Sequence, residues 1–144
     1  MKRLVAVSLF ALALFAAGAA TAQTEKWNQG KVTALSAELV SSVSGLQTAF
    51  QQSNQAQDPM MQETVAQILD SLGLLEFEAI HLNAMLKSGA GLTGTLPAYR
   101  RLQELHSELM GYSGQVAITA FLSPPLTKAK ATLTKLAAYY PPAP

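Results

Sequence analysis

The sequence contains no cysteine. This absence excludes disulfide bonds, metal sites built from thiolates, covalent haem attachment through a C-x-x-C-H motif and a lipid-modified amino-terminal cysteine. A chain of 144 residues that lacks cross-links has to be held together by its hydrophobic core, and this length is enough for one domain. We therefore expect a single domain that is stabilised by packing alone.

Charged residues are also scarce, and two of the ten basic ones, Lys2 and Arg3, stand at the start of the chain. An apolar run from Leu4 to Ala17 follows, and then the small residues 20–22. This order is typical of a secretory signal peptide, and the apolar run is shorter than the roughly 20 residues that span a bilayer. We predict that residues 1–22 are a cleaved signal peptide, and that a periplasmic or secreted chain without a transmembrane span begins at Gln23.

Neither sign of charge dominates the predicted mature chain. Without its leader, the chain carries eight basic and nine acidic residues. Proteins that bind nucleic acid or anionic membrane surfaces usually carry a clear excess of positive charge. We therefore expect neither nucleic acid nor an anionic membrane surface as a partner.

What the sequence has in quantity is apolar residues with helical spacing. They recur at three- and four-residue intervals, which places them on one face of a helix that turns about 100° per residue. Four stretches show this pattern: 31–52, 58–87, 95–120 and 123–140. Because the connections between them are short, successive helices should lie side by side. We predict an all-α fold, an antiparallel up-down-up-down four-helix bundle that occupies residues 23–140 and is followed by a proline-rich tail, residues 141–144.

Capping residues indicate where the second helix begins and ends. Asp58 and Pro59 form a start signal for the second helix, because a carboxylate can accept the free amides of the first turn and proline has no amide hydrogen to lose there. A lysine, a serine and a glycine at residues 87–89 form the matching stop signal. Before the first helix, we expect residues 23–30 to be disordered or loosely docked, with Trp27 packed against the bundle.

The third helix is expected to start at a Thr95 cap with Pro97 in its first turn. Gly111 and Gly114 lie inside this stretch, and each costs about 1 kcal/mol relative to alanine. A kink or weak point near Gly111 is therefore predicted. Ser123 is expected to cap the fourth helix.

Two glycine-containing motifs resemble functional signatures but lack the required context. Residues 89–94 match G-x-G-x-x-G, yet a dinucleotide site needs this motif after a β-strand, and here a helix precedes it. Residues 111–115 come near the G-x-S-x-G nucleophile elbow, but Gln115 replaces the last glycine and no strand leads into it. We therefore predict neither a nucleotide site nor a serine hydrolase.

The two histidines are the natural candidates for metal or haem ligands. Glu78 and His81 match the E-x-x-H half of a di-iron site, but Gln103 stands at the matching position before His106 and the fourth helix has no carboxylate. His81 with Met85, and His106 with Met110, would each supply a nitrogen and a sulfur ligand for copper or haem. The two pairs lie at different levels of a helical hairpin, so only His106 with Met110 remains as a candidate pair.

One acidic residue is level with His106 in the predicted hairpin. Glu76 lies about eleven residues before the end of the second helix, His106 about ten residues after the start of the third, and each is about 40° from the apolar centre of its helix. We expect the two side chains to meet inside the bundle. The contact is either a structural hydrogen bond or part of a small-ligand or metal pocket formed by Glu76, His106, Met110 and Ser113.

A second candidate surface lies on the other side of the second helix. Leu74, Phe77 and Met85 fall roughly opposite its apolar stripe, which predicts an exposed apolar strip for a protein partner or for self-association. We therefore expect an exported, non-catalytic binding or envelope-associated module, whose ligand the sequence does not name. The alternative is a bundle that binds a transition metal or b-type haem.

Overall fold

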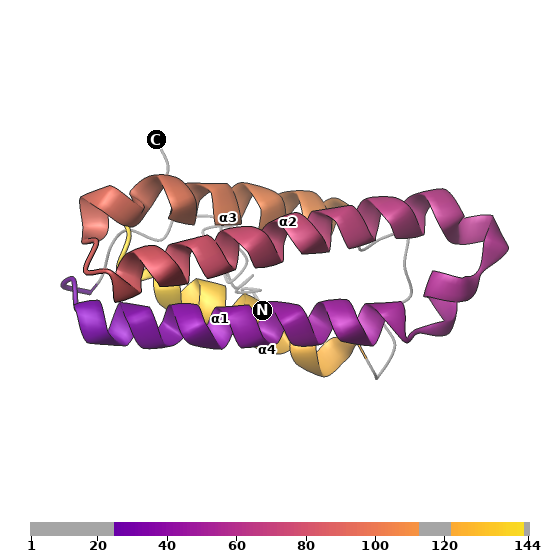
Figure 1. Ribbon diagram of the computed structural model, residues 1–144, viewed down its shortest axis with the longest axis horizontal. Coiled ribbons are helices and arrows are strands. Elements are labelled where there is room, and N and C mark those ends of the chain that lie inside the picture. The colour runs from indigo at the N-terminus through magenta and orange to yellow at the C-terminus, as the bar shows by residue number, and fades with distance from the viewer. Residues whose placement is uncertain (1–24, 113–121, 143–144) are drawn as a thin grey trace, which may run out of the picture.

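The computed structural model describes residues 25–112 and 122–142. Within these ranges all regular secondary structure is helical. The elements are α1 (Gln29–Gln51), η1 (Asn54–Gln57), η2 (Pro59–Met61), α2 (Gln62–Lys87), α3 (Leu92–Tyr112) and α4 (Ser123–Ala137), of which η1 and η2 are short 3-10 helices. The helices α1, α2 and α3 lie lengthwise beside one another (Figure 1). The all-α prediction is confirmed for the described part of the chain.

The four long helices form a bundle with one wide seam. α1 packs against both α2 and α4, and α2 also packs against α3. Among the described residues, the backbones of α3 and α4 approach each other less closely than these three pairs do. No helix within the described ranges is both long and apolar enough to cross a membrane.

The core is formed by apolar stripes from all four long helices. Their leucines are almost completely shielded from solvent, and burying one such side chain contributes roughly 2 kcal/mol. Examples are Leu39 of α1, Leu72 and Leu82 of α2, Leu102 of α3 and Leu136 of α4. The helical spacing of apolar residues therefore identified the inner face of each helix correctly.

Buried hydroxyl groups also line the inner faces of the helices. Ser42 Oγ donates to Glu38 O at 2.7 Å, and Thr132 Oγ1 donates to Lys128 O at 2.9 Å. Each side chain satisfies its own hydrogen-bonding capacity within its helix, so it can be buried without a partner on another helix.

α3 begins at Leu92, four residues before Leu96, the first helical residue that a Thr95 cap predicts. Thr95 is not a cap but an interior residue. Its amide donates to Gly91 O at 3.0 Å, its side chain is completely buried, and its Oγ1 lies 2.8 Å from Tyr140 Oη. The Gly91 carbonyl thus accepts the first helical hydrogen bond. Pro97 consequently lies inside the helix rather than in its first turn.

The other helix ends agree with the sequence in part. The Asp58 carboxylate accepts a hydrogen bond from Met60 N at 2.9 Å and so caps η2, while α2 itself begins four residues later. α2 ends at Lys87 as predicted, and Gly89 has a φ of 90°, which glycine adopts more readily than other residues. Ser123 is the first residue of α4, not its cap.

The residues before α1 are docked on the bundle. Trp27 packs edge-to-face against Tyr140, with ring centroids 5.5 Å apart. The side-chain amide of Gln29, at the start of α1, donates to Leu86 O near the end of α2 at 2.8 Å. The predicted packing of Trp27 is confirmed, and the described part of this segment is held at one end of the bundle.

Three predicted features lie outside the described residues. They are the signal peptide at residues 1–22 with the mature start at Gln23, the end of the third helix at residues 113–120 with Gly114, and the last two residues of the tail.

Candidate functional site

The wide seam between α3 and α4 contains a groove of about 280 Å³. This volume is just below the lower end of the range for small-molecule sites, about 300 Å³. The lining combines aromatic, amide, hydroxyl, basic and apolar groups. The lining residues are Tyr99, Gln103 and His106 of α3, and Lys130, Leu133, Thr134 and Ala137 of α4. We refer to this feature as the α3–α4 groove.

His106 brings a buried polar atom without a partner to this groove. Its Nε2 atom is shielded from solvent and makes no hydrogen bond, and the ring belongs to the described part of the chain. Burial lowers the pKa of His106 below its usual 6.5, and the nearby Lys130 ammonium lowers that pKa further. The ring is therefore neutral around pH 7. A neutral imidazole can accept or donate a hydrogen bond, or bind a metal ion.

Tyr99 supplies the aromatic part of the groove. Its ring stacks on Tyr140 with centroids 4.0 Å apart, and its hydroxyl accepts a hydrogen bond from Gln103 Nε2 at 2.8 Å. Burial, reinforced by the neighbouring Tyr140, raises the pKa of Tyr99 to about 12. The hydroxyl therefore stays protonated, and the groove offers neutral polar groups beside the Lys130 cation.

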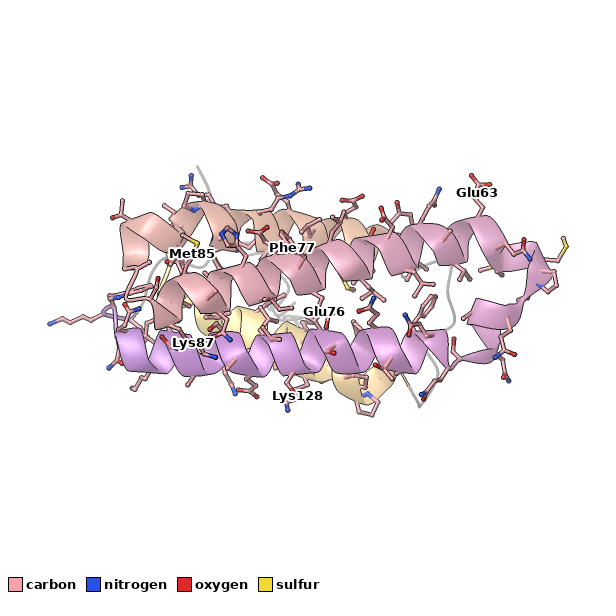
Figure 2. All side chains as sticks on the ribbon, viewed as in Figure 1. Glu63, Glu76, Phe77, Met85, Lys87 and Lys128 are labelled. Atoms are coloured by element: carbon pink, nitrogen blue, oxygen red, sulfur yellow. The ribbon has the colours of Figure 1, made fainter. Side chains whose placement is uncertain are left out.

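The predicted contact between Glu76 and His106 is not formed. Both residues are described, and no hydrogen bond or ion pair joins them. Figure 2 shows Glu76 between α2 and α1, whereas His106 lines the groove toward α4. The helical spacing gives the angle between each residue and the apolar centre of its helix. It does not say which neighbouring helix the residue faces. The two offsets point to different helices, so the pair prediction is wrong.

Of the other two predicted pocket residues, only Met110 belongs to the described part of the chain. Met110 is half-buried one turn further along α3, and Ser113 lies outside the described residues. The described ranges contain no group of three or more histidine, cysteine, aspartate or glutamate side chains that could hold a metal ion. Of the four predicted residues, the structure therefore places His106 in the groove, Met110 near it along α3, and Glu76 elsewhere.

The second histidine makes a local pair on the surface of α2. His81 Nδ1 lies 3.2 Å from Glu78 Oε1, and the His81 side chain is 52% exposed. The two residues are three positions apart on one helix, and side chains at this spacing are neighbours on the helix surface. The E-x-x-H spacing therefore reflects a local pair within one helix, in which His81 is exposed and the Glu78 side chain, at 15% exposure, is largely covered.

Three large apolar side chains are exposed together on the outer side of α2. Leu74, Phe77 and Ile80 are 46%, 67% and 49% exposed. At about 100° per residue, Phe77 points directly away from the buried stripe, and the other two flank it on either side. Figure 2 shows Phe77 on the side of α2 that is turned away from α1. We call these three residues the α2 apolar patch.

Met85 does not belong to this patch, although the sequence placed it there. It is half-buried and packs against the core cluster, on the α3 side of α2 (Figure 2). Its direction differs from that of Phe77 by about 80°, which brings it within reach of the neighbouring helix. Ile80 was missed, although it lies as far from the buried stripe as Leu74 does. The same calculation, at about 100° per residue, would have identified Ile80.

The α4 side of the groove could not be identified from the sequence. Lys130 and Thr134 are exposed residues on the outer part of α4, and their spacing there is that of ordinary solvent-facing positions. Only the relative rotation of α3 and α4 places them opposite His106.

The chain matches no protein-family model, no curated protein and no solved structure. Its function is therefore argued from the α2 apolar patch and the α3–α4 groove.

Proposed function

We propose that this protein is an exported, non-enzymatic helical bundle that binds a protein partner through the α2 apolar patch. The observation that carries the proposal is the joint exposure of Leu74, Phe77 and Ile80 on one helix. Covering them with a partner removes apolar surface from water, which contributes about 25 cal/mol per Å². Contiguous exposed apolar side chains commonly mark an interaction surface.

The chemistry of the α3–α4 groove supports a role without catalysis. Its titratable side chains are Tyr99, His106 and Lys130. The Tyr99 hydroxyl stays protonated because its pKa is raised to about 12, and His106 Nε2 has no hydrogen-bond partner in the described structure. A nucleophile needs a base within hydrogen-bonding reach, and these three side chains make no such pair with one another.

Export and an alternating direction of the four helices are part of the proposal. Export is supported by the charged start, the short apolar run and the small residues 20–22 of the leader, which fit a periplasmic or secreted protein. The up-down-up-down arrangement is supported by contacts between opposite helix ends. Gln29 at the start of α1 binds Leu86 near the end of α2, and Trp27 packs on Tyr140 beyond the end of α4.

Photo-cross-linking in the cell of origin tests the proposed surface. A photoreactive residue at position 77 should give a covalent adduct with another protein chain. The matched control is position 60, because Met60 is another apolar side chain and is 92% exposed, but lies outside the patch. Equal adduct formation at both positions, or none at position 77, would contradict binding through the patch.

A second candidate function is the binding of a small ligand or a transition metal in the α3–α4 groove. The unpaired Nε2 of His106 favours it, because a ligand would satisfy this nitrogen. Haem b, the other cofactor of this alternative, needs more room than a groove of about 280 Å³ offers. Metal analysis and an absorbance spectrum of protein purified from its native source test this candidate. Stoichiometric metal or colour that is lost in His106→Leu would support it, and a clear, metal-free protein would contradict metal and haem binding.

A further inference from the structure

We propose that the partner is a second copy of this chain, bound patch to patch about a two-fold axis with the two α2 helices antiparallel. This inference rests on the proposed function, because it names the occupant of the α2 apolar patch. Two features of the outer side of α2 carry it. One is an open position beside Phe77, and the other is the distribution of charge along the helix.

The open position is Gly73, one turn before Phe77. A Cβ atom at Gly73 would meet nothing within 4 Å, so the helix surface has a shallow gap there. When two α2 helices pair antiparallel about a centre level with Leu75, each Phe77 lies opposite Gly73 and Leu74 of the second copy, because residue levels are spaced by about 1.5 Å. The exposed ring of one copy then fills the gap of the other. A surface that complements itself in this way is what a two-fold interface requires.

Charge along the same side of α2 agrees with the antiparallel direction. The exposed acids Glu63 and Asp70 lie in the first half of the helix, and the exposed basic side chains His81 and Lys87 lie in the second half. The register that pairs Phe77 with Gly73 also places Asp70 of one copy opposite His81 of the other. Glu78 lies beside His81 on the same helix and is already its partner, at 3.2 Å. Antiparallel pairing places Asp70 opposite His81 and Glu63 level with Lys87, whereas parallel pairing would place each acid beside the same acid of the other copy.

The α2 apolar patch could instead dock on α1 of another copy, but the surface there is less complementary to it. A shallow groove of about 560 Å³ runs along the outer side of α1, lined by small residues that include Ala37, Ser41 and Gly45. None of its lining residues is charged, so it offers no partner to Asp70. Docking there would also join unlike surfaces, which produces rings or open chains rather than two-fold dimers. We therefore infer that the α2 apolar patch binds the same patch of a second copy.

Sedimentation velocity on the purified mature chain tests self-association directly. The pairing covers only the middle turns of one helix, so we expect a reversible dimer with a dissociation constant on the order of micromolar. Phe77→Glu should raise this constant about tenfold or more, because a charge then faces the apolar patch of the second copy. Met60→Glu, at an exposed apolar position outside the patch, should leave it unchanged.

Two glycine substitutions separate the two-fold arrangement from docking on α1. Gly73→Ala and Gly45→Ala both add a methyl group in open space inside a helix, so each should raise the melting temperature by roughly 3 °C. Only Gly73→Ala should weaken the dimer, because it fills the gap that receives Phe77. Weakening by Gly45→Ala instead, or growth beyond dimers, would overturn the two-fold arrangement.

The register can be tested with disulfides because the natural chain has no cysteine. An oxidised mixture of the Asp70→Cys and His81→Cys proteins should form a cross-linked heterodimer, and neither protein alone should cross-link. Cross-linking of either variant on its own, or no cross-linking in the mixture, would overturn the antiparallel register. A wild-type chain that stays monomeric while position 77 captures a different protein in the cell would overturn self-pairing and leave the proposed function standing.

Discussion

His106 brings an unmet hydrogen-bonding group into the α3–α4 groove, and this has a measurable energetic consequence. A buried polar group without a partner costs about 1–3 kcal/mol, whereas an apolar side chain of similar size has no such cost. We predict that His106→Leu raises the free energy of unfolding, measured in urea, by about 1 kcal/mol. His81→Ala is the control and should change it by less than about 0.5 kcal/mol, because His81 is 52% exposed. A clear loss of stability in His106→Leu would show that the ring nitrogen has a partner.

The same residue should make stability depend on pH. The pKa of His106 lies below its usual 6.5 in the folded chain, because burial and Lys130 disfavour the charged ring. As the pH falls below 6.5, the unfolded chain takes up a proton that the folded chain resists, so stability decreases until the pH reaches the lowered folded pKa. The difference in unfolding free energy between His106→Leu and wild type should therefore grow in this window. A difference that is constant with pH would contradict the lowered pKa.

Tyr140 joins three parts of the chain through one buried side chain. Its hydroxyl lies 2.8 Å from Thr95 Oγ1, and its ring contacts those of Tyr99 and Trp27. We predict that Tyr140→Phe lowers the free energy of unfolding by about 1 kcal/mol through the lost hydrogen bond. Tyr140→Ala should lower it by about 3–5 kcal/mol, because the ring contacts are lost as well. Tyr139→Phe is the matched control and should be close to neutral, and equal effects of the two phenylalanine variants would contradict the role of the bond to Thr95.

At the level of single helices, the sequence predicted the inner faces well and the starting residues less well. The inner face follows from a period repeated over many residues, as with Leu72 and Leu82 of α2, so one ambiguous residue does not change it. The start of a helix depends on a few local choices. At α3, threonine looked like a cap, yet Thr95 is buried with its Oγ1 2.8 Å from Tyr140 Oη, and the Gly91 carbonyl accepts the first helical hydrogen bond instead.

The position of Pro97 inside α3 leads to a prediction at this scale. Proline cannot donate the hydrogen bond that this position of a helix normally makes, and its ring crowds the preceding turn. Pro97→Ala should therefore raise the free energy of unfolding, by up to about 3 kcal/mol. Pro124→Ala is the control, because Pro124 lies in the first turn of α4, where proline is tolerated. Thermal unfolding of the two variants compares them, and an equal effect would mean that Pro97 also belongs to a first turn.

At the level of the whole molecule, what could be predicted depends on how many helices a feature involves. Exposure of Phe77 depends on the phase of one helix, so the sequence was sufficient to predict it. The contact between Glu76 and His106 required the neighbours of two helices to be known, and Glu76 turns toward α1 while His106 turns toward α4. The same information was missing for Lys130, which reaches the groove only through the packing of α4.

The proposed export also concerns the whole chain, and it gives a direct prediction. The intact mass of the exported protein should correspond to a chain that starts at Gln23, because cleavage is expected after the small residues 20–22. Recovery of the exported protein with residues 1–22 still attached would contradict the signal peptide.

The central claim, that the outer side of α2 is covered by another protein chain, can be measured by cysteine accessibility in living cells, since the natural chain has no cysteine of its own. Ala84 is exposed on the outer side of α2 beyond the patch, and Ala131 is exposed on α4. In dilute purified protein, Ala84→Cys and Ala131→Cys should react with a maleimide at similar rates. In the cell, Ala84→Cys should react about tenfold more slowly than Ala131→Cys, because only about a tenth of the chains then have this side of α2 uncovered. A tenfold ratio corresponds to about 1.4 kcal/mol of free energy. Equal rates in the cell would contradict the claim.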